Sequence, residues 1–282
     1  MVKFSTSMFE KKNLFGMRSV GRFFVNPSSY LIPTRILKKA DSERGLVDNF
    51  IFSLENAKGG ELLLDAGAGS FRYEKTLTSK GYLYESQDFS EVFDSESRGK
   101  HTYVCDITNI PIEESRFDII ICTQVLEHLV DPRAAFTEFS RILKPGGVLM
   151  LTTNFLFPIH GAPYDYFRFT VFGLQNLCEA SGFSSPDISP RGGFFAFTAK
   201  VIFDFPAIVK SWLFYGNANP HGPTKIQMRN PILILLSLPF VFVLDLTFSL
   251  LAFFISTLDF LDKKNRFTLG YQLTAKAVKL SS

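Results

Sequence analysis

The sequence predicts an α/β fold built on a mostly parallel sheet, and two observations indicate it. Apolar runs without alternation, such as LLLDAG at residues 62–67, have the pattern of strands that are buried on both faces. These runs alternate with helix patterns, which is the arrangement of βαβ units. With 282 residues, 46% of them hydrophobic, the chain is long enough for one large domain with a sizeable insertion.

The elements follow in order along the chain, each from its own pattern. Strands are predicted at 61–67, 81–90, 101–108, 116–124, 147–154 and 267–277, and helices at 41–60, 131–147 and 171–183. The helix at 131–147 has the clearest boundaries. Asp131 is its N-cap, Pro132 takes the first position, and Pro-Gly-Gly forms its exit.

These patterns divide the chain into four parts. Residues 1–45 form a polar N-terminal arm with scattered aromatic side chains, and residues 46–200 carry the alternating strands and helices of the core. Residues 201–264 are predicted to be a hydrophobic helical insertion, because they are rich in apolar side chains and poor in charge. Residues 265–282 hold the last strand of the sheet and a short tail.

Composition and charge argue against several classes of protein. A net charge of +3 is too small to indicate a nucleic-acid partner. Three cysteines lie far apart without CxxC spacing, which argues against a disulfide framework and favours a reducing, cytoplasmic compartment. The four histidines are scattered, so no metal site is predicted. No signal peptide is predicted, because charged and polar residues interrupt the apolar residues at the start.

A glycine turn follows the first predicted strand. The strand ends at Asp65, and Gly67 and Gly69 follow with one residue between them. In an open α/β sheet, ligands bind in the crevice at the carboxyl ends of the strands, and glycines let the backbone approach a ligand closely. The turn lacks Gly-Lys-Ser/Thr, which excludes a P-loop. Taken alone, it fits a tight structural turn equally well.

Two further aspartates are predicted at the same edge of the sheet. Asp88 ends the second strand, at about the distance from Asp65 at which nucleotide folds carry an acidic residue for the ribose hydroxyls. Asp106 ends the third strand, where a carboxylate can accept from an adenine amino group with Ile107 against the ring. Each aspartate alone also fits a strand-end turn. Three of them at consecutive strand ends predict one cleft for an adenosine.

Four stretches, taken in order, resemble the motifs of class I S-adenosylmethionine-dependent methyltransferases of the type-11 kind. They are LLLDAGAGS, ESQDFS, CDITNIPIEESRFDIIICTQVLEHLVDP and RILKPGGVLMLTT. The resemblance covers roughly residues 45–200, with a final strand near 267–277. It implies a Rossmann-like seven-stranded sheet with flanking helices and an antiparallel last strand, and S-adenosylmethionine as the cofactor.

The same resemblance implies which residues bind the cofactor. Asp65, Gly67 and Gly69 would line its methionine part, and Asp88 would bind its ribose, with Phe89 beside Asp88 in the cofactor-binding set. Asp106 and Ile107 would bind the adenine, and Gln124 would border the sulfonium. Phe71 departs from the family pattern, in which a third glycine is commoner at this place.

Methyl transfer from a sulfonium is an in-line displacement with a neutral leaving group, so alignment of the nucleophile is the main requirement. If the nucleophile is a hydroxyl, a general base with a pKa near neutral helps. We expect His160 to be this base, because the loop at 154–170 follows the fifth strand and opens over the same sheet edge. A histidine that caps the backbone of its own loop is the alternative.

The stretch HGAPYDYFR at 160–168 also supplies the expected substrate-binding residues, and similar family members have a comparable stretch. They are Tyr164, Tyr166 and Arg168. Arg168 could clamp an acidic group or could form a surface ion pair. His128 is expected to be a helix residue that faces the sheet, and with Glu127 it does not form the HExxH motif of a metalloprotease.

The segment ILILLSLPFVFVLDLTFSLLAFFIS at 232–256 has one charge, Asp245, and one proline, Pro239. Its composition allows a membrane crossing, but a single crossing would separate the last strand from its sheet. Basic residues flank it on both sides, which favours both ends on the cytoplasmic face: Lys225, Arg229, Lys263, Lys264 and Arg266. We therefore expect helices that break at Pro239 and that pack in an insertion or lie in the membrane interface.

The stretch at 201–215 has the same character, so peripheral membrane contact is expected through residues 201–256. A buried helical subdomain over the active site and a dimer interface are the alternatives. Two functions of different class follow. One is a methyltransferase that acts on a small or lipid-linked acceptor, such as a glycan precursor or a quinone-like lipid. The other is a non-catalytic membrane- or partner-binding protein that retains the fold. A nucleic-acid methyltransferase is disfavoured, since no Asn/Asp-Pro-Pro-Tyr/Phe motif follows the fourth strand.

Overall fold

A computed structural model describes residues 33–89, 100–215, 231–264 and 266–278. The chain divides into two compact units. One comprises Ser42–Thr198 with Ile255–Ser282, and the other comprises Met1–Asp41 with Ala199–Phe254. Residues 1–32 of the expected N-terminal arm, and Lys225 and Arg229 before the long apolar segment, lie outside the described residues.

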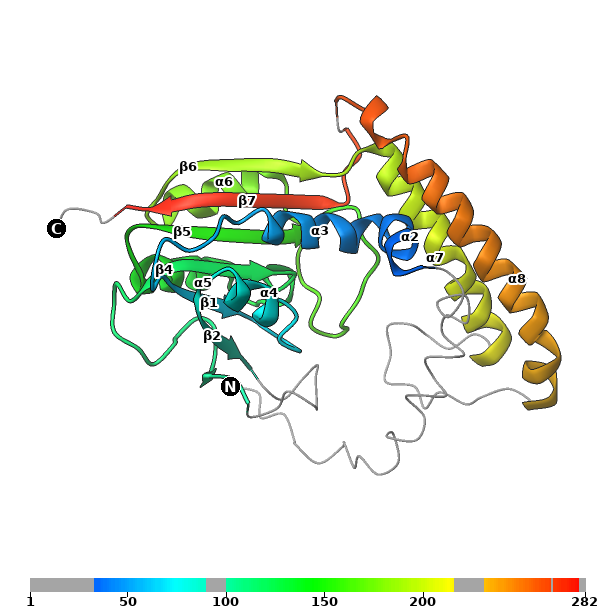
Figure 1. The fold of residues 1–282 in the computed structure, drawn as a ribbon, viewed down its shortest axis with the longest axis horizontal. Helices are drawn as coiled ribbons and strands as arrows, with labels where there is room; N and C mark the ends of the chain where they lie inside the picture. The colour runs from blue at the N-terminus through cyan, green and yellow to red at the C-terminus, as the bar shows by residue number, and fades with distance from the viewer. Residues whose placement is uncertain (1–32, 90–99, 216–230, 265, 279–282) are drawn as a thin grey trace. The chain divides into compact units, whose positions relative to one another are not determined.

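The first unit is built on a seven-stranded sheet (Figure 1). Its strands are β1 (Leu62–Ala66), β2 (Leu83–Asp88), β3 (Tyr103–Val104), β4 (Phe117–Thr123), β5 (Leu143–Asn154), β6 (Phe183–Arg191) and β7 (Gly270–Ala277). They lie in the order β3-β2-β1-β4-β5-β7-β6. The first five run parallel, and β7 pairs antiparallel with both β5 and β6. The predicted fold class is confirmed, including the antiparallel last strand.

Helices cover both faces of this sheet. They are α3 (Ser42–Phe52), α4 (Glu74–Ser79), α5 (Pro132–Ile142) and α6 (Val171–Ala180). Leu63 of β1 packs in the core cluster that includes Ile51 of α3, whereas its neighbour Leu64 packs in the cluster that includes Phe139 of α5. Both leucines are fully buried. This two-sided burial is why the strand is an unbroken apolar run in the sequence.

Helix α3 ends earlier than the sequence predicts. It was expected to continue towards Gly59, but its last residue is Phe52. The ammonium of Lys80 donates to the carbonyl oxygen of Phe52 at 2.8 Å and also to that of Leu54. These bonds satisfy carbonyls that another helical turn would have used, so the chain leaves the helix here.

Helix α5 also ends early, at Ile142, and its expected Pro-Gly-Gly exit lies inside β5 instead. Asp131 caps the helix as predicted and accepts from the Ala134 N–H at 3.0 Å. At the other end, the Arg116 N–H donates to the carbonyl of Ile142, and Leu143 pairs with Phe117 of β4. The residues that were predicted to continue the helix therefore form sheet hydrogen bonds instead.

Strand β6 was not predicted from its residues, because Pro186 and Pro190 interrupt its pattern. Its position explains both prolines. β6 is the edge strand and pairs only with β7, so one side of its backbone needs no hydrogen-bond partner in the sheet. The strand predicted at 101–108 is reduced to Tyr103–Val104.

The second unit contains α2 (Thr34–Ala40) and most of two long helices, α7 (Phe194–Tyr215) and α8 (Pro231–Ser256). The expected break at Pro239 is wrong, because α8 continues through it as one helix. A proline removes one backbone hydrogen bond. The packed cluster of Phe214, Ile234 and Val241 holds the helix on both sides of the proline. Among the described residues, Ile232–Leu261 is long and apolar enough to cross a membrane, and only 22% of its most apolar window is buried.

Candidate active site

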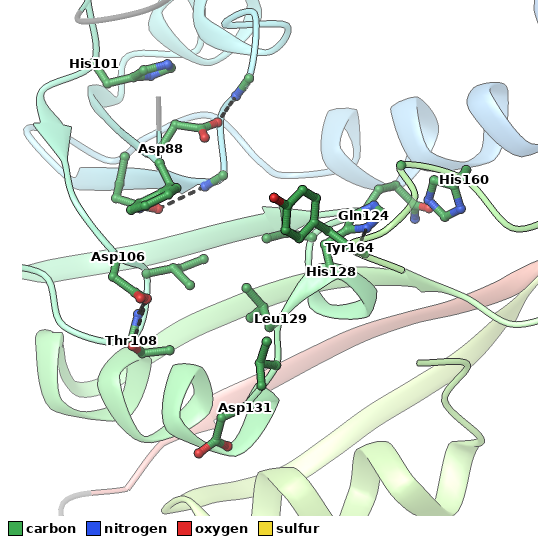
Figure 2. Close-up of a pocket in the computed structure, with 18 residues that line it drawn as sticks. Asp88, His101, Asp106, Thr108, Gln124, His128, Leu129, Asp131, His160 and Tyr164 are labelled. Carbon is green, nitrogen blue, oxygen red and sulfur yellow. Dashed lines mark hydrogen bonds between the residues drawn. The ribbon is translucent and has the colours of Figure 1, made fainter. Parts of the chain in front are cut away.

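A cavity of about 690 Å³ lies at the carboxyl ends of the parallel strands (Figure 2). Its volume is within the range of small-molecule sites. The predicted site residues that line it are Gly67, Gly69, Asp88, Phe89, Asp106, Ile107, Gln124, His160 and Tyr164. Three others, Asp65, Tyr166 and Arg168, are not part of the lining. Figure 2 shows Asp88 and Asp106 towards one end of the cavity and His160 with Tyr164 at the other.

The glycine turn after β1 has the geometry that only glycine adopts without strain. Gly67 and Gly69 have φ angles of +74° and +54°. A Cβ atom on Gly67 would collide with the side chain of Val125, whereas the space beside Gly69 is open. The Gly67 N–H donates to the backbone carbonyl of Gln87 at 2.9 Å, which ties the turn to β2. Gly67 is therefore required both by its backbone conformation and by its closeness to Val125.

Phe71 keeps the backbone shape that a third glycine would have. Its φ is +58°, in the left-handed region, where a side chain costs about 1–2 kcal/mol. Its ring stacks on that of His101, with ring centroids 4.5 Å apart, and His101 lines the cavity. The departure from the family pattern thus changes the side chain at this position and not the fold of the turn.

Asp88 and Asp106 line the cavity, Asp88 as the last residue of β2 and Asp106 two residues after the end of β3. Asp88 Oδ2 accepts from the Gly69 N–H at 2.7 Å, which fixes its side chain against the turn. Asp106 Oδ1 accepts from the backbone N–H and the hydroxyl of Thr108, at 2.9 and 2.8 Å. Ile107 supplies an apolar surface beside them. Hydroxyl and amino donors with an apolar ring between them, as in adenosine, match this set of groups.

Asp65 does not reach the cavity, although it lies next to the carboxyl end of β1. Its side chain is buried, and one carboxylate oxygen accepts from the Tyr84 hydroxyl at 2.8 Å. The pKa of Asp65 is raised to about 7: burial is the main cause, the Tyr84 hydrogen bond opposes the rise, and the charge of Asp88 adds to it. The geometry assigns Asp65 to the contact between β1 and β2. It does not support the prediction that this carboxyl lines the methionine part of a cofactor.

Gln124 directly follows β4 and turns the chain sharply into the cavity wall. Its φ is +55°, and its backbone N–H donates to the carbonyl of Thr152 at 3.0 Å. Its side-chain amide donates to the Thr152 hydroxyl at 3.1 Å. Both contacts hold Gln124 to the neighbouring strand β5, so its place in the cavity wall is fixed by the sheet.

Glu127, which sequence reasoning did not select, is a buried carboxylate next to His160. It lies in the short 3₁₀ helix Leu126–His128 after β4 and is 0% exposed. Thr153 and Asn154 at the end of β5 donate to its two oxygens at 2.9 and 2.7 Å. Its Oε1 lies 3.7 Å from His160 Nε2. The position of Glu127 just beyond the end of β4 could have indicated a site residue. The sequence prediction considered this stretch only for the spacing of a metalloprotease motif.

His160 is held in its loop by several acceptors. The interaction of its ring N–H with the Glu127 carboxylate raises the pKa of His160 above the ordinary value, burial opposes this, and the charges of Glu127 and Asp165 add to the rise. Its Nδ1 lies 3.2 Å from the carbonyl of Pro158, and its backbone N–H donates to Asp165 Oδ2 at 2.9 Å. A proton taken up by this imidazole is therefore stabilised by nearby negative charge.

His128 lies at the cavity and not against the sheet, so the prediction for it is wrong. It lines the cavity, and its Nδ1 lies 2.6 Å from the carbonyl of Tyr164. Its ring contacts that of His160 edge-on, with ring centroids 4.7 Å apart. Ligand atoms of Glu127, His128 and His160 lie within 4.8 Å of one another, a set that divalent metals can use. A metal there would share the Glu127 carboxylate with both of its hydrogen-bond donors.

Arg168 fastens the loop that carries His160. Its guanidinium forms a two-pronged ion pair with Asp165, at 2.6 and 2.7 Å, and also donates to the carbonyls of Phe157, Pro158 and Phe167. These bonds engage all five guanidinium N–H groups. The pair holds the pKa of Asp165 at about 2. In this arrangement Arg168 positions the loop, and the expected clamp on an acidic substrate would have to break these bonds.

Tyr166 also holds the loop in place through its backbone, because its N–H donates to the carbonyl of Glu127 at 2.9 Å.

The guanidinium of Arg191 is buried. It donates to the carbonyl of Thr153 at 2.9 Å and pairs with Glu43 at 3.2 Å. Burial lowers the pKa of Arg191, and the charge of Glu43 opposes this. Arg191 thus anchors the strand end whose side chains hold Glu127.

Comparison with known proteins adds three findings. A family model described as a methyltransferase domain matches residues 64–151. The ubiquinone biosynthesis O-methyltransferase of Coxiella burnetii is 32% identical over 121 residues, which cover 38% of this chain and 52% of that protein. The malonyl-[acyl-carrier protein] O-methyltransferase of Serratia marcescens is 26% identical over 107 residues, covering 36% and 42%. The chain therefore spans about half the length of the curated relatives it matches.

Solved structures show the same fold. A Haloferax volcanii methyltransferase complex with the activator Trm112 matches with a TM-score of 0.51 and 14% identity, covering 86% of this chain and 93% of that chain. A Haemonchus contortus phosphoethanolamine N-methyltransferase 2 bound to S-adenosylhomocysteine matches with a TM-score of 0.50 and 14% identity, covering 82% and 52%.

This chain therefore has a methyltransferase domain, and its sheet order and the cavity at the strand ends are those of the class I S-adenosylmethionine-dependent fold. Its methyltransferase domain includes residues 64–151, and the cofactor of this class is S-adenosylmethionine.

Proposed function

We propose that this protein transfers a methyl group from S-adenosylmethionine to an oxygen, nitrogen or carbon atom of a small-molecule or lipid-linked acceptor. A glycan precursor or a quinone-like lipid would be such an acceptor. One observation carries the proposal: a single cavity has carboxylates for an adenosine at one end and a histidine–carboxylate pair at the other. Relatives named for ubiquinone biosynthesis and for malonyl-[acyl-carrier protein] support a small or carrier-linked acceptor.

The cavity residues fit the cofactor in size and chemistry. Asp88 would accept from the ribose hydroxyls, with Phe89 beside it, and Asp106 with Ile107 would hold the adenine. Gly67 and Gly69 would let the backbone approach the methionine part, and Gln124 would border the sulfonium. When bound, S-adenosylmethionine supplies a methyl group on a positively charged sulfur, which leaves as a neutral thioether. The protein then needs only to hold the two reacting atoms in line.

At the acceptor end, we propose that His160 takes the proton from a hydroxyl acceptor. The buried Glu127 carboxylate lies 3.7 Å from Nε2 and favours the protonated imidazole. Tyr164 lines the same end of the cavity and would contact the acceptor. Tyr166 and Arg168 are proposed to act on the acceptor only indirectly, through the loop that they hold.

Glu127→Gln is expected to shift the pH dependence of turnover to lower pH. Glu127 raises the pKa of His160, and a protonated imidazole cannot accept a proton, so the wild-type rate should rise with pH through this raised pKa. Glutamine keeps the size of the side chain but removes the charge. The variant should therefore reach its plateau at a lower pH than wild type. A rate profile whose midpoint does not move would remove Glu127 from this role.

The acceptor class also bears on where the enzyme works. We propose that the methyltransferase domain lies on the cytoplasmic side and contacts the membrane through residues 201–256, which would bring a lipid-linked acceptor within reach. The exposed apolar side chains of α7 and α8 support this contact, among them Ile208, Trp212 and Phe240.

A labelled-methyl screen tests the proposed function. Purified protein and labelled S-adenosylmethionine would be incubated with lipid and sugar-lipid extracts, with the Asp88→Ala variant as the control. The expected result is one labelled product whose formation requires Asp88. Binding of the cofactor with no transfer to any extract would favour the alternative of a non-catalytic protein that retains the fold.

A further inference from the structure

Helices α7 and α8 lie side by side as an antiparallel hairpin (Figure 1). Phe205 stacks on Phe248 with ring centroids 4.9 Å apart, and Lys210 pairs with Asp245 at 2.9 Å. Phe214 packs with residues further back along α8, at Ile234 and Val241. As α7 advances, its partners on α8 therefore move towards the start of that helix.

The outward surface of the hairpin is apolar, whereas polar side chains are among its buried positions. Along α8 up to Phe254, the buried positions include Asp245 and Ser249, each 4% exposed. The described exposed positions, apart from Pro239 and Thr247, carry large apolar side chains: Ile232, Leu233, Leu235, Leu236, Phe240, Val243, Leu250, Leu251 and Phe254. On α7, Val201, Ile208 and Trp212 form an exposed stripe at helical spacing. Water is a poor solvent for such a surface.

This distribution distinguishes a helix that is inserted into a membrane from a helix that lies flat on its surface. A helix in the membrane interface needs a polar face towards water. α8 lacks one, because its charged residue is turned inward to Lys210 and its described exposed residues, Pro239 and Thr247 apart, are large and apolar. The charged side chains of the two helices are paired: Lys210 with Asp245 at 2.9 Å, and Lys200 with Asp204 at 2.8 Å in the first half of α7. At 1.5 Å per residue the 26-residue α8 is about 39 Å long, enough for a hydrocarbon layer of about 30 Å.

The chain enters and leaves the hairpin at the same place. β6 ends at Arg191 just before α7, and β7 begins at Gly270 soon after α8; these two residues are paired in the sheet. Asp259, which follows α8, accepts from the N–H groups of Gly193 and Ala196 at 2.8–3.0 Å. A hairpin solves the topological problem of the single crossing, because both of its ends leave on one side.

We infer that α7 and α8 insert into a lipid bilayer as a helical hairpin, with both ends on the side of the methyltransferase domain. This deepens the membrane contact within the proposed function, and its tests do not measure methyl transfer, so the two can fail separately. The bilayer is favoured over a second copy of the chain because the exposed apolar side chains extend from Ile232 to Phe254, about 33 Å along α8, which matches a hydrocarbon layer of about 30 Å.

Trp212 provides the first test, because it is the sole tryptophan of the chain and lies in the exposed stripe of α7. Full-length protein would be mixed with phosphatidylcholine vesicles that carry a quencher either near the headgroups or deep in the acyl chains. Insertion predicts a blue shift of the emission and stronger quenching by the deep quencher. Quenching by the shallow quencher alone, or no response to vesicles, would overturn insertion.

A matched pair of substitutions gives the second test. Phe240→Glu places a charge on the exposed face of α8, and Phe172→Glu places the same charge at an exposed phenylalanine of α6. Insertion predicts that Phe240→Glu lowers partitioning into neutral vesicles about 100-fold, whereas Phe172→Glu leaves it unchanged. Equal partitioning of both variants would contradict the inference. The inference would also be contradicted if the wild-type protein does not bind vesicles but self-associates, and if Phe240→Glu abolishes this self-association.

The inner ion pair gives a third test that a surface contact would not pass. Lys210→Met leaves Asp245 without its partner inside the hairpin and should reduce partitioning. The double change Lys210→Met with Asp245→Leu removes both charges and should restore it. Unchanged partitioning in the single variant would show that the pair lies outside the hydrocarbon.

Discussion

Replacing Gly67 with valine is expected to lower the affinity for S-adenosylmethionine by about 30-fold or more. The φ angle of +74° and the collision with Val125 act together on the turn. A β-branched side chain in the left-handed region costs about 1–2 kcal/mol, and overpacking costs about 1–3 kcal/mol more. At least about 2 kcal/mol would then oppose the binding shape of the turn, and every 1.4 kcal/mol is tenfold in affinity. Isothermal titration calorimetry measures the loss.

Gly146→Val is the matched control for this variant. Gly146 has a similar φ of +77° but open space around its missing side chain, and it lies outside the cavity lining. The control should lose stability without losing the cofactor. Circular dichroism of both variants would show that the sheet is intact. Wild-type affinity in a folded Gly67→Val protein would contradict the role given to the turn.

Replacing His160 with alanine is expected to lower turnover by about 10²–10⁴-fold, the usual contribution of a general base. The affinity for S-adenosylmethionine should change little, because His160 lies at the opposite end of the cavity from Asp88 and Asp106 (Figure 2). Turnover with the acceptor found in the labelled-methyl screen, measured beside cofactor binding, separates the two effects.

His101→Ala provides the contrasting histidine. His101 lines the cavity and stacks on Phe71 of the glycine turn, so its loss should weaken cofactor binding more than the chemical step. If His160→Ala instead loses affinity and turnover equally, His160 is not the base. Its role would then be the alternative stated from the sequence, a histidine that holds its own loop.

The sheet was predictable because its strands are buried on both faces. Leu63 and Leu64 point into different core clusters, so both positions are apolar and the strand shows no alternation in the sequence. The acidic residues at the strand ends stand out against these apolar runs. The edge strand β6 could not be predicted in the same way. At an edge, a backbone N–H on the outer side has no partner to lose, so Pro186 and Pro190 are tolerated where strand rules exclude them.

Within the site, sequence order gave the position of a residue along its strand but not the face to which its side chain points. Asp65 and Asp88 both lie at strand ends, yet Asp65 turns to Tyr84 and Asp88 turns to the glycine turn. Glu127 and Arg191 were missed for a related reason. Their roles depend on hydrogen bonds to β5 from distant parts of the chain, and no local pattern records such partners.

The central claim is that this cavity binds S-adenosylmethionine through the strand-end carboxylates, and calorimetric titration of the cofactor tests it most directly. We predict one site per chain in wild type. Asp88→Ala should weaken binding by about 10- to 100-fold, as expected when a charged hydrogen-bond partner worth about 1.5–3 kcal/mol is lost. Asp187→Ala, on the edge strand β6, should bind as wild type does. Absence of binding in wild type, or equal affinity in wild type and Asp88→Ala, would contradict the account.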